Sequence, residues 1–394
     1  MSASTEKKTR IAEREAGTYK KAIKAEEEAK KKATSAKRWT WTAIGIVILL
    51  VFVILMNSTG LYSKTTALKI GDRAFSPTEV NFNYARQYVN FVNQYGSYAS
   101  LFGLNTSNGI GTLADQACTM TGEENYSWKD YFLDNAITGL KQNQALLKYA
   151  KEQGLELTDE EKDELTAAYE TLNESAVSNG YADADHYISA QYGKGSNIAV
   201  AQMFDEEATL ASKAYTAKSD EINAEVTDEE VGEAYPTIAV RHILVKAVAD
   251  ENGEYTDEAK EEAKVKAENI LKEWEGNDAT EESFAALAEQ YSEDEGSNTN
   301  GGLYDAVMEG QMVTEFNDFC FDESRKPGDT GIVYGESGSY AGYHIMYFVG
   351  EGDPANNETG RQNIVSERAN EWLSELADKE EVVKTFFFRL CGKV

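Results

Sequence analysis

The chain has 394 residues, of which 41% are hydrophobic and 27% are charged, and this composition excludes a wholly disordered protein. Lys and Arg total 38 against 68 Asp and Glu, which gives a formal net charge of −30. So acidic a chain is not a general nucleic-acid binder, because such proteins neutralise phosphates with a basic surface. The three cysteines form no Cys-x-x-Cys pair, which excludes zinc ribbons and thioredoxin-type redox sites.

The beginning of the chain differs in charge from the rest. Residues 1–38 carry a net charge of +6 and the remainder −36, while residues 39–56 are uncharged and apolar from Ala43 onward. A helix over 39–56 measures about 27 Å, close to the hydrocarbon thickness of a bilayer. Two tryptophans stand at its start beside a Lys-Arg pair, as at a membrane interface.

This pattern predicts a basic cytoplasmic segment over 1–38 and a transmembrane helix over 39–56. It predicts a single-pass protein of the cell membrane, with a cytoplasmic N-terminus and its bulk outside the cytoplasm. A cleaved secretory signal is the alternative, although the apolar run is longer than usual and lacks an Ala-x-Ala site.

Three helix starts in residues 65–235 share one signature. A Ser or Thr stands three residues before a Glu in Ser76-Pro-Thr-Glu79, Thr158-Asp-Glu-Glu161 and Thr227-Asp-Glu-Glu230. This is the capping-box pattern that opens a helix. The region is nearly free of proline and of alternating strands, so a mostly helical domain of five or six helices is predicted, with a long loop over 96–127.

The pattern changes after Pro236. The β-branched run 237–248 predicts a buried strand. Helices are predicted at 257–275, 281–290 and 314–319, and further strands at 331–334 and 343–349. These elements indicate a compact α+β domain over 236–352. The remaining segment, 353–394, is predicted to hold a helix from Arg361 to about Phe387.

Two histidines stand inside apolar strands of this domain, His242 and His344. A lone histidine in a strand is ordinarily a core residue with satisfied hydrogen bonds. Two in adjacent strands of a small sheet can instead hydrogen-bond across it, which would fix one tautomer and form the floor of a cleft. The sequence alone therefore leaves open whether His242 and His344 are core residues or form the floor of a cleft.

Several motifs in this domain occur together in one order. They are Arg241-His242-Ile-Leu-Val, Phe284-x-x-Leu-Ala-x-x-Tyr-Ser292, Gly301-Gly302, Gly310-Gln-Met312-Val, Glu315-Phe316, Pro327-Gly328 and Gly342-Tyr-His344-Ile. Residues 236–350 strongly resemble the parvulin-type peptidyl-prolyl cis/trans isomerase domain. The remaining chain is similar to the membrane-anchored PrsA foldases, which have a SurA-like helical chaperone region.

The resemblance implies an α+β protein with a fixed order of parts. After the transmembrane helix come a helical SurA-like chaperone domain (65–235) and a parvulin-type domain (236–352) with a small antiparallel sheet and flanking helices. The C-terminal helix is expected to pack back on the chaperone domain. A homodimer through the chaperone domain is a further expectation.

The resemblance also implies a function and a set of site residues. The function is an extracytoplasmic foldase that isomerises X-Pro bonds and assists the folding of secreted polypeptides, without a cofactor or a metal. By the resemblance, Met312 and Phe316 match the apolar pocket for the proline ring, and His242 and His344 match the buried pair beneath it. Asp294 matches a position near the rotating carbonyl, and Ser339 matches the hydroxyl beside the second histidine. Core packing for Met312 and Phe316, and a solvated acid for Asp294, remain the alternatives.

The sequence departs from the family pattern in two places. Leu303-Tyr304-Asp305 follows the glycine pair directly, and the stretch before Tyr343 is longer and richer in glycine than usual. These departures leave open a holdase chaperone that uses the parvulin domain only to bind peptides. No arginine cluster follows Lys246, so phosphorylated substrates are not expected. The expected partners are unfolded secreted polypeptides and the membrane, and not nucleic acid.

Overall fold

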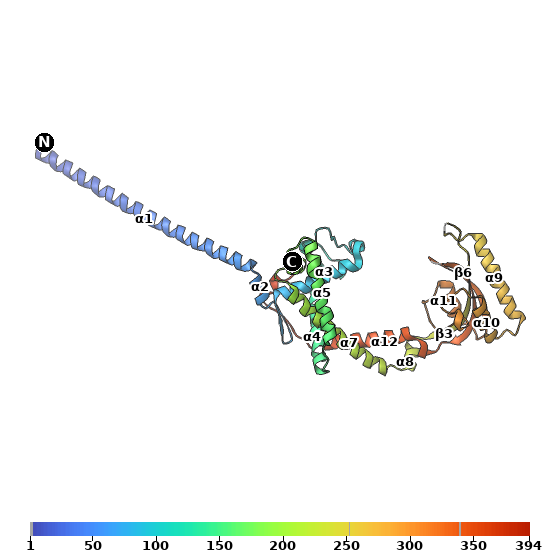
Figure 1. The fold of residues 1–394 in the computed structure, drawn as a ribbon. Helices are drawn as coiled ribbons and strands as arrows, with labels where there is room; N and C mark the ends of the chain where they lie inside the picture. Colours follow the sequence, from blue (N-terminus) through green and yellow to red (C-terminus); the bar gives the residue numbers. More distant parts are fainter. Residues whose placement is uncertain (1–2, 252, 339) are drawn as a thin grey trace. The chain divides into compact units, whose positions relative to one another are not determined.

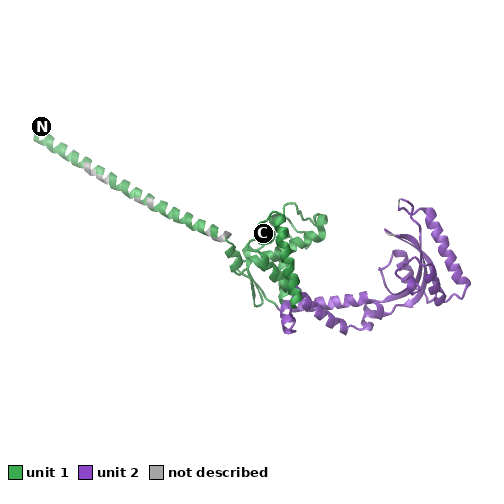
Figure 2. Ribbon diagram, in the orientation of Figure 1, with its two compact units in different colours: residues 1–144, 157–208, 380–394 green, residues 145–156, 209–379 purple. Residues whose placement is uncertain are grey.

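The computed structural model describes residues 3–251, 253–338 and 340–394, except the side chains of residues 13, 18, 19, 22, 23, 33, 36, 52 and 55–57. The chain divides into two compact units (Figure 2). Unit 1 comprises residues 1–144, 157–208 and 380–394, and unit 2 comprises residues 145–156 and 209–379.

Unit 1 begins with the helix α1 (Ala3–Asn57) and the short helix α2 (Thr59–Lys64). Among the residues that the structure describes, no helix combines the length and the apolar character needed to cross a membrane. For this part of the chain the prediction of a transmembrane helix over 39–56 is therefore wrong, and with it the single-pass anchor.

The rest of unit 1 is a helical assembly beside a small antiparallel sheet of order β2-β1-β7. Its elements are β1 (Leu68–Ile70), β2 (Arg73–Phe75), α3 (Pro77–Tyr95), η1 (Gly96–Phe102), η2 (Ile110–Asp115), α4 (Trp128–Glu152), α5 (Asp159–Ser178), α6 (Ala184–Tyr192), α7 (Ile198–Glu225), β7 (Val382–Lys384) and η5 (Phe386–Leu390). The boundary between the units falls within α4 and α7.

The capping boxes predicted from the sequence are confirmed. At the start of α3 the Ser76 side chain accepts from the backbone N–H of Glu79, while the Glu79 carboxylate accepts from the backbone N–H of Ser76 at 2.7 Å. The same reciprocal pair opens α5 and the later helix α8 (Asp228–Ala234). Each box satisfies two backbone donors that the first helical turn leaves unpaired.

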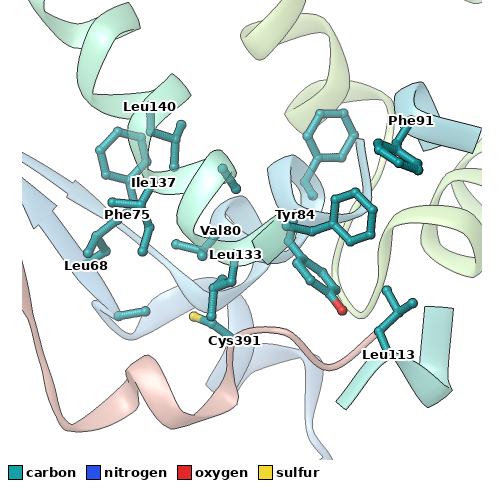
Figure 3. Close-up of a cluster of buried hydrophobic side chains, with 14 of the residues drawn as sticks. Leu68, Phe75, Val80, Tyr84, Phe91, Leu113, Leu133, Ile137, Leu140 and Cys391 are labelled. Atoms are coloured by element: carbon teal, nitrogen blue, oxygen red, sulfur yellow. The ribbon is translucent and has the colours of Figure 1, made fainter. Parts of the chain in front are cut away.

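The core of unit 1 is aromatic and includes residues from the C-terminal end of the chain. Tyr84, Phe75, Trp128 and Phe132 are each less than 2% exposed. Burial of such a side chain contributes about 1.5–3 kcal/mol. Figure 3 shows Cys391, from the C-terminal segment, close to side chains of this cluster such as Leu133.

The C-terminal segment does not continue as a helix to Phe387, as the sequence predicted. The helix α12 (Glu358–Asp378) ends earlier, and β7 then pairs antiparallel with β1, with Lys384 opposite Leu68. Strand pairing with β1 satisfies backbone groups that a longer helix would have satisfied internally. Because β1 is remote from β7 in the sequence, no local sequence pattern predicts this pairing.

Unit 2 contains a four-stranded antiparallel sheet of order β4-β3-β6-β5. Its elements are β3 (Thr237–Lys246), α9 (Asp257–Gly276), α10 (Glu281–Tyr291), η3 (Asn298–Asn300), β4 (Leu303–Met308), α11 (Thr314–Cys320), β5 (Thr330–Ser337), β6 (Tyr340–Glu351) and η4 (Pro354–Asn356), together with α8 and α12. Strand β4 was not predicted, because its sequence follows a glycine turn and lacks a clear apolar alternation.

The two faces of this sheet are covered by different helices. Side chains of one face, such as Ile243 and Ile345, pack with residues of α9 and α10. Side chains of the other face, such as Val240 and Met346, pack with residues of α11. Figure 1 shows α9 and α10 on one side of β3 and β6 and α11 on the other. Because neighbouring residues of a strand point to opposite faces, this division decides which residues reach the site.

The helix α12 packs with the end of α7 and with α8. Its residues Ile364, Val365 and Ala369 form one buried cluster with residues 222, 226 and 231. Arg361 of α12 also donates to the Val226 carbonyl at 2.7 Å.

Candidate active site

His242 and His344 lie on neighbouring antiparallel strands, β3 and β6, and point to the same face of the sheet. His344 pairs with Leu244, so the two histidines are diagonal neighbours. Their rings are nearly parallel, with centroids 5.2 Å apart, and the two Nδ1 atoms are 3.0 Å apart. Both side chains are buried, at 3% and 5% exposure. One hydrogen bond thus joins two buried imidazoles across the sheet.

The other nitrogen of His242 contacts an acidic group. Its Nε2 lies 3.0 Å from Asp294 Oδ2 and 3.1 Å from Ser297 Oγ. The same Asp294 oxygen accepts hydrogen bonds from the Ser297 hydroxyl and, at 3.1 Å, from the Tyr304 hydroxyl. The hydrogen bond from His242 holds the pKa of the Asp294 carboxyl well below its usual range. Asp294 is therefore ionised at neutral pH and its Oδ2 already accepts three donors.

The other nitrogen of His344 contacts a phenol. The Tyr340 hydroxyl lies 2.9 Å from His344 Nε2, and the two rings meet edge to face. Burial, with a smaller contribution from His242, lowers the pKa of His344 to about 3, so this imidazole is neutral at neutral pH. Ser339, for which the resemblance implied this hydroxyl role, lies outside the described residues.

Apolar side chains lie beside this row of hydrogen-bonded side chains, which runs from Asp294 through His242 and His344 to Tyr340. Phe316 of α11 is 2% exposed, and its ring meets both imidazoles edge to face at centroid distances of 5.3 and 5.4 Å. Met312 and Val313 precede α11 and line the same cleft, which has a volume of about 460 Å³. The full lining is His242, Leu244, Lys246, Asp294, Tyr304, Gln311, Met312, Val313, Phe316, Tyr340 and His344. The structure thus brings five of the six predicted site residues to one cleft.

The glycine pair explains how the loop after η3 approaches the histidine strand so closely. Gly301 and Gly302 both have φ of +70°, a conformation that costs other residues free energy. A Cβ on Gly302 would lie 2.2 Å from the His242 carbonyl oxygen. The Gly302 carbonyl accepts from the His242 backbone N–H at 2.8 Å. The pair therefore lets Tyr304, two residues further on, reach Asp294.

Three members of the hydrogen-bonded chain were not predicted as site residues: Ser297, Tyr304 and Tyr340. Two of them carried a sequence signal. Ser297 stands three residues after Asp294, a spacing at which side chains in a turn meet. Tyr340 stands four residues before His344, and alternate residues of one strand share a face. Tyr304 depends on a strand that was not predicted, and its sequence position offered no such signal.

Comparison with known proteins relates these elements to characterised families. Residues 225–348 match the family model described as the PPIC-type PPIase domain. The chain is 37% identical over 126 residues to foldase protein PrsA 3 of Bacillus cereus, which covers 32% of this chain and 36% of that protein. It is 34% identical over 107 residues to the chaperone SurA of Chromohalobacter salexigens, covering 27% of this chain and 21% of that protein.

Among solved structures, the chain is similar to the peptidylprolyl isomerase PrsA of Bacillus anthracis. The match has 22% identity and a TM-score of 0.24, and covers 61% of this chain and 92% of that one. The first four curated relatives are matched over 36% to 59% of their own length. The comparisons confirm the resemblance predicted from the sequence, to a PrsA/SurA-like foldase with a parvulin-type isomerase domain.

Proposed function

We propose that residues 236–352 catalyse the cis/trans isomerisation of X-Pro peptide bonds, and that the chain assists the folding of polypeptides outside the cytoplasm. The observation that carries the proposal is the cleft in which the hydrogen-bonded pair His242 and His344 lies beside the apolar side chains of Met312 and Phe316. The match of residues 225–348 to the PPIC-type PPIase domain supports it. The extracytoplasmic location rests on the similarity to the PrsA foldases.

The reaction requires no nucleophile, metal or cofactor. Amide resonance gives the peptide bond a rotation barrier of about 18–20 kcal/mol, so an uncatalysed X-Pro bond takes tens to hundreds of seconds to isomerise. An isomerase lowers this barrier by binding the twisted amide more tightly than either planar form. Each 1.36 kcal/mol of such selective binding gives about a tenfold rate increase.

The cleft offers two kinds of contact for a twisted amide. Met312, Val313 and Phe316 form an apolar surface against which a proline ring can be buried. Twisting the amide removes the charge separation of its resonance form, so an environment of low polarity favours the twisted state over the planar one. The His344 imidazole, neutral at neutral pH, supplies hydrogen-bonding atoms without introducing a full charge at that position.

The proposal is tested by measuring the isomerisation of a proline-containing peptide by the full chain, with Met312→Ala as the active-site variant. Met120→Ala is the matched control, because Met120 is 44% exposed and lies in unit 1. We expect acceleration by the wild type and the control, and a loss of about tenfold or more in kcat/KM for Met312→Ala. No acceleration by the wild type would refute the isomerase function.

A second cavity supports the holding of unfolded polypeptides by unit 1. It measures about 320 Å³ and lies among α3, α5, α6 and α7. Its lining combines three tyrosines (Tyr169, Tyr187 and Tyr192) and the apolar residues Phe82, Leu172, Ile188 and Ala201 with the polar residues Arg86, Asn90 and Asp205. Aromatic and aliphatic side chains of this kind bury apolar segments of a ligand. We propose that an apolar segment of a folding polypeptide occupies this crevice.

A refolding assay distinguishes isomerase activity from the holding of unfolded polypeptides. Its substrate is a protein whose folding is limited by proline isomerisation. An active foldase raises the refolding rate. A chain that prevents aggregation without changing that rate is instead a holdase, with the parvulin domain as a peptide-binding module. Protease treatment of intact cells tests the location, since a domain outside the cytoplasm is digested without lysis.

A further inference from the structure

Unit 2 has a second hollow besides the cleft, at the junction of α8 and β3. It is a groove of about 490 Å³, close in volume to the cleft itself. It is lined by the end of α8, the start of β3, the end of β4, the residue after α11 and one residue of α12. Its apolar and aromatic side chains are Tyr235, Pro236, Ile238, Met308 and Phe321, together with Ala234. The groove therefore offers a mainly apolar surface to a ligand.

The groove and the cleft open from one apolar cluster, which lies between the sheet and α11. Phe316 is buried within this cluster and also lines the cleft. Ile238 and Phe321 are half-buried members of the cluster at the groove. Met312 and Val313 are half-buried members at the cleft. The same apolar layer is thus partly exposed in both hollows, on one face of the sheet.

The two hollows lie a few residues apart along β3. Ile238 lines the groove, and His242 lines the cleft four residues further along the strand. A strand rises about 3.3 Å per residue, so these two positions are about 13 Å apart. An extended polypeptide covers that distance with about four residues. A single bound polypeptide is therefore long enough to reach both hollows.

The turn between the two hollows is held by its own hydrogen bonds. Met308, which lines the groove, donates its backbone N–H to the side-chain oxygen of Gln311 at 3.0 Å, and Gln311 lines the cleft. The Gly310 N–H donates to the side chain of Asn317 on α11 at 2.6 Å. The turn is thus ordered before a ligand arrives, which reduces the entropy lost on binding.

We propose that the groove binds an apolar side chain of the polypeptide whose X-Pro bond lies in the cleft, about four residues from the proline. This inference rests on the isomerase activity proposed above and assigns a second contact to its substrate. Once the proline is bound, the second contact forms within the same complex, so even a modest apolar contact adds to the affinity. Glu309 is exposed on the turn between the hollows. A basic residue between the two bound side chains is therefore favoured over an acidic one.

The first test compares three peptides of equal length, each with one X-Pro bond and Lys beside it. One peptide has Leu four residues before the proline, one has Leu four residues after it, and the reference has Ser at both positions. We expect at least one Leu peptide to bind the full chain about fivefold to tenfold more tightly than the reference, because it buries one more apolar side chain. Equal dissociation constants for the three peptides, measured by calorimetry, would overturn the proposal.

A pair of variants tests whether the gain arises in the groove. Asn363 is exposed on α12 and lines the groove, so Asn363→Trp fills the space without a change in the sheet. We expect the Leu peptide to bind this variant no more tightly than the reference peptide does. Gln362→Trp is the matched control, since Gln362 is exposed one position earlier, about 100° around the helix. It should keep the gain. A gain that survives Asn363→Trp would refute the groove as the binding site.

The charge preference is tested with the tighter Leu peptide. Replacing the Lys between its proline and its Leu by Glu should weaken binding to the wild type about threefold, and weaken binding to Glu309→Gln less. An equal effect on the two proteins would refute the contribution of Glu309.

The same peptides separate this inference from the proposed function. Isomerisation of each peptide is measured beside its dissociation constant. A wild type that binds the Leu peptide more tightly without accelerating its isomerisation would refute the isomerase activity and support the groove as a polypeptide-binding site. An active wild type with equal affinity for all three peptides would refute the groove and leave the isomerase activity standing.

Discussion

The carbonyl of Gly302 accepts a hydrogen bond from the backbone N–H of His242 at 2.8 Å, and the two backbones approach so closely that a Cβ on Gly302 would lie 2.2 Å from the His242 carbonyl oxygen. This approach ties β4, the strand that carries Tyr304, to the strand that carries the first histidine. The hydrogen-bonded side chains of the cleft therefore depend on Gly302, a residue without a side chain.

Gly302→Ala is expected to destabilise unit 2 by about 2 kcal/mol or more, because it adds backbone strain at φ of +70° to a steric clash. Urea unfolding, with hydrogen exchange of β3 and β6, measures the loss. Gly276→Ala is the control: a Cβ there meets nothing within 4 Å and φ is not positive, so we expect little change. Equal effects of the two substitutions would contradict the close approach.

Asp294→Asn is expected to lower the free energy of unfolding at pH 7 by about 1–3 kcal/mol, since a hydrogen bond to a charged group is lost. The folded pKa of Asp294 is depressed by His242. Its stabilisation is therefore fully present above the unfolded pKa of about 3.9 and is lost as the pH falls through the folded value.

Unfolding measured from pH 8 to pH 2 checks this dependence. The difference between the wild type and Asp294→Asn should stay constant down to about pH 4 and shrink below it. Glu295→Gln serves as the control, because that neighbouring carboxyl has no hydrogen bond to His242 among the contacts described above. A difference that grows toward low pH would show that the sign of the pKa shift is wrong.

Asn81→Ala is expected to destabilise unit 1 by about 2–4 kcal/mol. Asn81 is fully buried and accepts from the Gly392 N–H at 2.7 Å, while its amide donates to the carbonyls of Leu390 and Lys393 at 3.3 Å. The substitution leaves these backbone groups without their partner. Hydrogen exchange of β1 and β7 reports the loss. Asn83→Ala on the same helix removes one bond within the helix and should cost much less.

Tyr187→Ala is expected to weaken the holding of unfolded polypeptides about fivefold, because it removes one aromatic wall of the crevice in unit 1. The measurement is the concentration of the chain that halves the aggregation of an unfolded protein. Tyr98→Ala, at a residue that is 67% exposed, is the matched control. If both variants suppress aggregation as well as the wild type, the crevice does not hold the polypeptide.

The amino-acid sequence by itself determined the features that depend on neighbouring residues. The three capping boxes, the helices of the parvulin-type domain and the motifs around His242 and His344 could be recognised from spacings of a few residues. Such signals are local, because a helix start satisfies its own backbone and a strand alternates its own side chains. The resemblance to the parvulin-type domain rests on the same kind of signal.

Only the tertiary structure decided the pairings between distant segments. Asn81 and Gly392 are 311 residues apart, and β7 finds its partner in β1 at the other end of the chain. Tyr304 reaches Asp294 because the glycine pair admits β4 beside β3, and Tyr340 reaches His344 because Gly335 leaves room for both. These contacts follow from the packing of whole strands, so no short stretch of sequence contains them.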